Sequence, residues 1–175
     1  MKWILKALGG LLVFGACALA GLRLSRRDML QAEELAAFRS AFLLLKSEIQ
    51  YARTPLAEAF SHTAAFNDEQ PSVFFYNMAE RLQQNDGSSA SQVWAESLQA
   101  LRYSSRLADE DFRRFALLGQ TIGCLDGSSQ AEGLDAAMHH IDDRIAQLHN
   151  HSNSHVRMYR NIGALFGALL AVSLL

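Results

Sequence analysis

Two apolar segments that contain no carboxylate lie at the ends of this 175-residue chain, and all 18 acidic residues lie between them. The segments are Trp3–Leu22 and Ile162–Leu175. An α-helix rises about 1.5 Å per residue, so crossing a hydrocarbon core of about 30 Å takes roughly 17–25 apolar residues. Ile4–Leu22 meets that length if Lys6 extends to the interface, whereas Tyr159–Leu175 needs a thin bilayer or an adjacent protein. The layout predicts an integral membrane protein with two spans.

The segment between the two ends is long enough for one modest core. We divide the chain into an N-terminal transmembrane helix (1–23), a middle domain (24–156) and a C-terminal transmembrane helix (157–175). The middle domain holds 11 Lys/Arg and 18 Asp/Glu, a formal charge of 11 − 18 = −7. Basic residues are not interleaved with aromatic ones in it, so nucleic acid is not expected as a partner.

Positive charge flanks the inner side of both apolar segments and predicts the orientation. The positive-inside rule places the middle domain in the cytoplasm. The residues concerned are Arg23, Arg26, Arg27, Arg157 and Arg160, with only Lys2 and Lys6 on the other side. A cleaved signal peptide ending at Ala18-Leu19-Ala20 is the rival interpretation, but three arginines directly after the apolar run would resist export of the middle domain.

Helical periodicity runs through the middle domain, and no convincing strand alternation interrupts it. We therefore predict an all-α fold, a cytoplasmic bundle of about six helices between the two transmembrane helices. The first and last helices are expected to continue from the membrane segments and to lie side by side. Their apolar stripes are Leu35, Phe38, Phe42, Leu45 and Ile49 in the first helix, and Leu134, Met138, Ile141, Ile145 and Leu148 in the last.

Capping signals predict where several helices begin. Thr54 is expected to cap a helix whose first residue is Pro55, because proline lacks the N–H that would be unsatisfied there. Asp109 is expected to cap a later helix, and Ser129-x-x-Glu132 matches a capping box for the last one. Gly119 and Gly123 indicate close packing followed by a helix stop.

Possible chemical sites are weak in this sequence. His139/Asp143 and His151/His155 have the i, i+4 spacing of helical metal ligands, but the neighbouring apolar positions make a solvated face the preferred interpretation. Ser61-His62 lacks the nucleophile-elbow sequence of a hydrolase. No P-loop or dinucleotide fingerprint is present. Cys17 and Cys124 imply no disulfide framework, and Cys124 is interpreted as a small buried residue.

Four stretches, taken in order, resemble the stage III sporulation protein AB family. The first two are Glu48-Ile49-x-Tyr51-x-x-Thr54-Pro55-Leu56-x-Glu58-Ala59 and Trp94-x-Glu96-Ser97-Leu98. The others are Leu118-Gly119-x-x-x-Gly123-x-x-Asp126-x-x-x-Gln130 and Tyr159-Arg160-x-x-Gly163-x-x-x-Gly167. Ala52, where the family usually has glycine, and the His/Asn-rich stretch 147–155 depart from the family pattern.

The resemblance implies a non-enzymatic platform in a sporulation channel or secretion apparatus between mother cell and forespore. The middle domain would be similar to the F domain of type II secretion and type IV pilus platform proteins. The implied partners are a companion secretion-type ATPase, the AA-like stage III sporulation protein, and other channel membrane proteins. The implied location is the mother-cell-derived membrane around the forespore. No catalytic residue, cofactor, metal or small-molecule substrate is implied.

Docking to the ATPase is expected to involve Tyr51, Thr54, Pro55 and Asp126. Gly163 and Gly167 have the spacing that lets membrane helices approach closely. Two alternatives stay open: a membrane-anchored sensor or adaptor that responds to metal or pH through its C-terminal histidines, and a membrane-tethered hydrolase. Charged positions such as Glu33, Glu34, Arg113, Arg114, Asp142 and Asp143 are expected to form solvated helix faces.

Overall fold

The computed structural model describes the backbone of residues 2–66, 69–84, 87–123 and 126–174, and side chains mainly within 26–150. The chain forms two compact units, Gln31–Ile145 and the combination of Met1–Leu30 with Ala146–Leu175. Among the described residues, no helix is long and apolar enough to cross a membrane. The predicted spans, with Gly163 and Gly167, lie outside the residues whose side chains are described.

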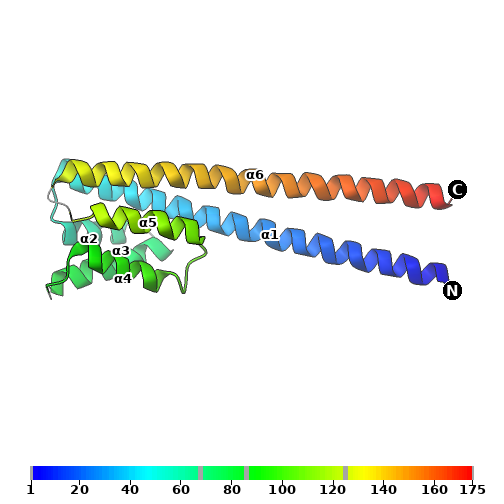
Figure 1. The fold of residues 1–175 in the computed structure, drawn as a ribbon, viewed down its shortest axis with the longest axis horizontal. Coiled ribbons are helices and arrows are strands. Elements are labelled where there is room, and N and C mark those ends of the chain that lie inside the picture. The colour runs from blue at the N-terminus through cyan, green and yellow to red at the C-terminus, as the bar shows by residue number, and fades with distance from the viewer. Residues whose placement is uncertain (1, 67–68, 85–86, 124–125, 175) are drawn as a thin grey trace. The chain divides into compact units, whose positions relative to one another are not determined.

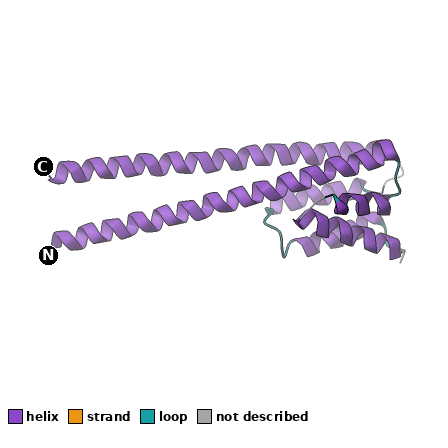
Figure 2. Cartoon of the chain, turned by 180° about the vertical axis from the view of Figure 1, so that it is seen from behind, coloured by secondary structure: helices purple, strands orange, loops and turns teal. Residues whose placement is uncertain are grey.

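Helices account for nearly all of the described chain, and Figure 2 draws no strand in that part. The all-α prediction is therefore confirmed. The elements in order are α1 (Lys2–Ser47), the π-helix η1 (Glu48–Ala52), α2 (Leu56–Ala65), α3 (Glu69–Gln84), α4 (Ala90–Leu101), α5 (Asp109–Thr121) and α6 (Gly127–Leu174). The bounds of α1 and α6 agree with the expectation that the first and last helices of the bundle continue from the terminal segments.

Within the unit Gln31–Ile145, the last part of α1 and the first part of α6 run antiparallel beside each other (Figure 1). Two ion pairs record the register: Arg39 Nε lies 2.5 Å from Asp142 Oδ1, and Lys46 Nζ lies 2.7 Å from Asp135 Oδ2. Moving seven residues forward on α1 moves the partner seven residues back on α6. The predicted side-by-side arrangement is confirmed for this unit.

The core of this unit is an aromatic cluster that helices α1 to α5 share. Ring centroids within the cluster lie 5.0 to 6.4 Å apart, at the distances where tilted and edge-to-face pairs are favourable. The Trp94 indole donates a hydrogen bond of 2.8 Å to the backbone oxygen of Phe115, which satisfies the one polar atom of that buried ring. The cluster comprises Phe38, Phe42, Phe60, Phe74, Phe75, Trp94 and Phe115.

The predicted apolar stripes mostly face this core. Leu35, Phe38, Phe42 and Leu45 of α1 are fully buried, as are Leu134 and Ile141 of α6. Ile49, the last residue of the first stripe, and Ile145 of the second are only partly buried, whereas Leu148 at the end of the second stripe is buried. The 3.6-residue period thus located the inner faces of both long helices, with only Ile49 and Ile145 less buried than predicted.

Two glycines behave as predicted from the sequence. A Cβ atom on Gly119 would lie 2.2 Å from Trp94 Cδ1, so only glycine lets α5 approach the indole this closely. Gly123 has a φ of +86° just after α5 ends at Thr121. The chain leaves the helix at Ile122, whose backbone is extended, and Gly123 then adopts the left-handed conformation that costs glycine little.

Candidate functional site

Three of the four predicted docking residues lie in and directly after η1, and Asp126 precedes α6. The structure brings these segments together, because a Cβ atom on Gly127 would lie 3.7 Å from Cγ2 of Ile49 in η1. We call this region the η1 corner; it consists of Glu48–Pro55 together with Asp126 and Gly127. Tyr51 is 79% exposed there, and Pro55 and Asp126 are also exposed.

η1 is a π-helical turn, wider than an α-helical one, that ends at Ala52, and the chain has left helical geometry at Pro55. The Glu48 carbonyl accepts hydrogen bonds from the N–H groups of both Arg53 and Thr54, the second at 3.2 Å. Arg53 has a φ of +53°, a left-handed conformation that costs energy for a residue with a side chain. Thr54 precedes a proline, which disfavours the helical conformation and forces the chain out of η1. The result is a sharp corner with Tyr51 on its surface.

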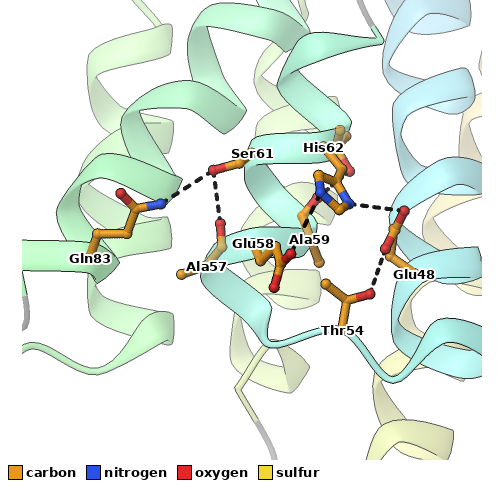
Figure 3. A network of polar contacts seen from close by, with 9 residues as sticks. Glu48, Thr54, Ala57, Glu58, Ala59, Ser61, His62 and Gln83 are labelled. Atoms are coloured by element: carbon orange, nitrogen blue, oxygen red, sulfur yellow. Dashed lines mark hydrogen bonds and ion pairs between the residues drawn. The ribbon is translucent and has the colours of Figure 1, made fainter.

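Side chains hold the η1 corner against α2, as Figure 3 shows. The Thr54 hydroxyl donates to Glu48 Oε2 at 2.6 Å, and His62 Nδ1 lies 3.3 Å from Glu48 Oε1. His62 Nε2 lies 3.8 Å from Glu58 Oε1, so the ring stands between two carboxylates. The hydrogen bond from Thr54 lowers the pKa of Glu48, with a smaller contribution from His62.

The predicted cap of α2 was wrong in its detail. Thr54 makes no capping bond; Pro55 occupies the N-cap position and α2 begins at Leu56. The Pro55 carbonyl accepts from the N–H groups of Glu58 and Ala59, both at 2.9 Å. Thr54 donates to Glu48 instead because the carboxylate, a charged acceptor, lies within reach.

Asp126 caps α6, so the predicted Ser129–Glu132 capping box was also wrong. The Asp126 carboxylate accepts from the N–H groups and hydroxyls of Ser128 and Ser129, at distances between 2.6 and 3.3 Å. These hydrogen bonds, that of the Ser128 hydroxyl foremost, lower its pKa to about 2. Asp126 therefore has a structural role that orders the start of α6 beside η1.

A buried carboxylate, Asp111, joins α1, α5 and α6, and it was not predicted from the sequence. Its oxygens accept from Gln31 Nε2 and the Ala108 N–H, both at 2.9 Å. His140 Nε2 and Arg144 Nε lie 3.2 and 3.3 Å away. Ala108, and not the predicted Asp109, is the N-cap of α5, and Asp111 binds back to its N–H from the third helical position.

Glu34 was expected on a solvated helix face, and this expectation was wrong. It is 3% exposed, not part of a solvated face. Its carboxylate accepts from the Ser105 hydroxyl at 2.5 Å and the Arg106 N–H at 2.9 Å, which ties the loop between α4 and α5 to α1. The other charged positions named from the sequence are exposed: Glu33, Arg113, Arg114, Asp142 and Asp143.

The candidate chemical residues do not assemble into a recognisable centre. The Ser61 hydroxyl donates to the Ala57 carbonyl and accepts from Gln83 Nε2, while His62 is directed to Glu48 (Figure 3). His139 and Asp143 are exposed. His151 and His155 lie outside the residues whose side chains are described. In the described part of the chain, no three His, Cys, Asp or Glu side chains are grouped as metal ligands.

Comparisons with known proteins agree on one family. The family model described as stage III sporulation protein AB matches residues 6–175. The chain belongs to this family. Stage III sporulation protein AB of Bacillus subtilis (strain 168) is 24% identical over 172 residues, which cover 98% of this chain and 100% of the relative.

A solved structure of stage III sporulation protein AB has the same fold. It matches with a TM-score of 0.65 and 24% identity, covering 70% of this chain and 96% of that chain. The resemblance found in the sequence is thus confirmed, and membership of the family assigns the chain a role in sporulation.

Proposed function

We propose that this chain is a non-enzymatic membrane platform of a sporulation channel, and that its helical unit Gln31–Ile145 docks a secretion-type ATPase at the η1 corner. The observation that carries the proposal is the family match over residues 6–175, which includes the segment that forms this corner. The platform has no nucleotide motif of its own, so the energy for transport comes from the partner.

The η1 corner has the properties of a docking site. Tyr51 presents an aromatic ring on the surface, and tyrosine is enriched among the residues that dominate binding energy at interfaces. The bonds around Glu48 fix the backbone on both sides of Thr54 before any partner arrives. A preformed site loses less conformational entropy on binding than a mobile one does.

Two further features support the location and the choice of partner. The apolar, carboxylate-free ends with arginines on their inner sides favour two spans and a cytoplasmic middle domain. The charge of −7 on residues 24–156 creates a field that attracts a basic partner surface. The proposed location is the mother-cell-derived membrane around the forespore.

The experiment is a binding titration of the full chain, in detergent or nanodiscs, against the companion secretion-type ATPase. We expect binding at micromolar or lower concentration, corresponding to about −8 kcal/mol or better. We also expect the chain alone to hydrolyse no ATP above a mock preparation. Folded protein that does not bind the ATPase, or hydrolysis that purifies with the chain, would contradict the proposal.

A further inference from the structure

A shallow groove runs between α4 and α5, away from the η1 corner. Leu98 and Phe112, both almost fully buried, form its floor. Ala95 of α4 and Ala116 of α5 line it from exposed positions on the two helices. These side chains are small, so the groove stays open to the approach of a third element.

The rim of the groove is basic although the domain is acidic. Arg102 and Arg113 line it together with Gln99, and no carboxylate among the described residues lines it. By contrast, residues 24–156 carry seven more acidic than basic residues. Residues 102–114 hold four of the 11 basic residues of that segment and three acidic ones, Asp109, Glu110 and the buried Asp111. The lining of the groove therefore carries positive charge on a domain that is negative overall, which favours an acidic partner there.

The two arginines differ in how they are held. The Arg102 guanidinium lies 5.0 Å from the centre of the Phe112 ring and 2.9 Å from Asp109 Oδ1, so it is already oriented at the rim. Arg113 is exposed and makes no ion pair within the part of the chain that the structure describes. It is thus available to a partner carboxylate. Leu117, 54% exposed, lies one turn after Arg113 on α5.

We propose that this groove binds an acidic amphipathic helix of a partner protein. Apolar side chains of that helix pack over Leu98 and Phe112, and its carboxylates pair with Arg113, beside the Arg102 guanidinium that Asp109 already holds. We expect the partner segment to be a helix because small side chains, here Ala95 and Ala116, leave room for a third helix to pack between two neighbouring helices. The proposal does not depend on ATPase docking. The two sites lie at different positions along α1. The start of α5, next to the groove, contacts α1 at Gln31 through Asp111. The η1 corner follows the end of α1 at Ser47, about 25 Å further along that helix.

The test uses the full chain in detergent micelles and a fluorescent synthetic helix of about 18 residues, with leucines on one face and glutamates on the other. A matched peptide carries lysines in place of the glutamates. Binding is followed by fluorescence anisotropy. The variants are Arg113→Glu and Arg114→Glu, which make the same charge change at adjacent exposed positions, only the first of which lines the groove. Ala116→Trp, also at an exposed position, fills the groove without changing its charge.

We expect the glutamate peptide to bind and the lysine peptide not to bind. Arg113→Glu and Ala116→Trp should each weaken binding roughly tenfold or more, while Arg114→Glu should change it by less than about threefold. Equal losses in the two arginine variants would overturn the proposal, as would no binding of the glutamate peptide up to about 1 mM. Sedimentation supplies a further check: self-association of the wild type that Arg113→Glu abolishes would assign the groove to a second copy of this chain instead.

Discussion

Asp111 illustrates how single buried polar groups hold this molecule together. It is fully buried and has four hydrogen-bonding or ion-pair partners on α1, the start of α5 and α6. A buried carboxylate is tolerated only when its oxygens are satisfied in this way. The group therefore fixes the relative positions of three elements of the unit Gln31–Ile145.

Replacing Asp111 by alanine should destabilise the protein by about 3 kcal/mol, because Gln31 and Arg144 would lose a buried partner. The measurement is the free energy of unfolding from urea denaturation. Asp109→Ala is the matched control, since Asp109 pairs with Arg102 at a position where its side chain is 80% exposed. Exposed pairs contribute little, so equal losses in the two variants would refute the role assigned to Asp111.

The Thr54–Glu48 bond predicts a pH dependence with a definite sign. The folded-state pKa of Glu48 is lowered, so its contribution to stability is present above the unfolded pKa and is lost as the pH falls through the folded pKa. Thr54→Val removes the largest cause of that shift. The variant should therefore lose more stability at pH 7 than at an acidic pH below the folded-state pKa of Glu48, where the carboxyl is protonated.

Unfolding titrations at the two pH values measure this difference. Thr121→Val provides the comparison, because the Thr121 hydroxyl donates to the backbone carbonyl of Leu118 and to no carboxylate. Its loss should be similar at both pH values. A pH-independent loss for Thr54→Val would mean that the hydroxyl does not stabilise the charged form of Glu48.

Among the elements, α4 and α5 depend on one close approach. The Cα of Gly119 faces the Trp94 indole so closely that an added methyl group has no room. Gly119→Ala should cost about 1–3 kcal/mol through overpacking, although alanine is the better helix former. Thermal and urea denaturation would measure the loss.

Gly127→Ala, in the first turn of α6, is the control for this prediction. Its added Cβ would lie 3.7 Å from Ile49, an ordinary contact. We expect no loss or a gain of up to about 1 kcal/mol from the change in helix propensity. A stable Gly119→Ala variant would show that Trp94 can move aside, and the tight packing would not be a constraint.

The sequence located elements well and their ends less well, for a physical reason. The spacing of apolar residues reflects burial of a whole helix face. It correctly predicted the inner positions of α1 and α6, such as Phe38 and Ile141. Caps depend on which acceptor lies nearest in three dimensions. Thr54 donates to Glu48 and not to the backbone of α2, and Asp126 accepts from Ser128 and Ser129. Which of several possible partners a side chain bonds depends on distances that only the folded backbone sets.

The candidate site was predicted in part for the same reason. The adjacency of Tyr51, Thr54 and Pro55 is evident in sequence, whereas the fold is what places Gly127, the residue after Asp126, against Ile49 of η1. Glu34 and Asp111 were missed because a charged residue next to apolar neighbours is usually solvated. Asp111, three residues after Ala108, carried half of a capping-box signal that could have been recognised.

At the scale of the whole molecule, charge and helix packing have separate roles in the proposed function. The antiparallel pair of α1 and α6 segments, joined by Arg39–Asp142 and Lys46–Asp135, supports the bundle in the unit Gln31–Ile145. In the proposed function, the η1 corner presents Tyr51 to a partner. In this account the platform acts by holding surfaces in place, not by catalysis.

The measurement that tests this account most directly compares two tyrosine variants of the full chain in binding to the companion secretion-type ATPase. Tyr51→Ala removes the exposed ring of the η1 corner, and Tyr76→Ala removes a comparably exposed ring from α3. We predict that Tyr51→Ala weakens binding roughly tenfold or more and that Tyr76→Ala leaves it nearly unchanged. Wild-type affinity in a folded Tyr51→Ala variant would contradict docking at the η1 corner.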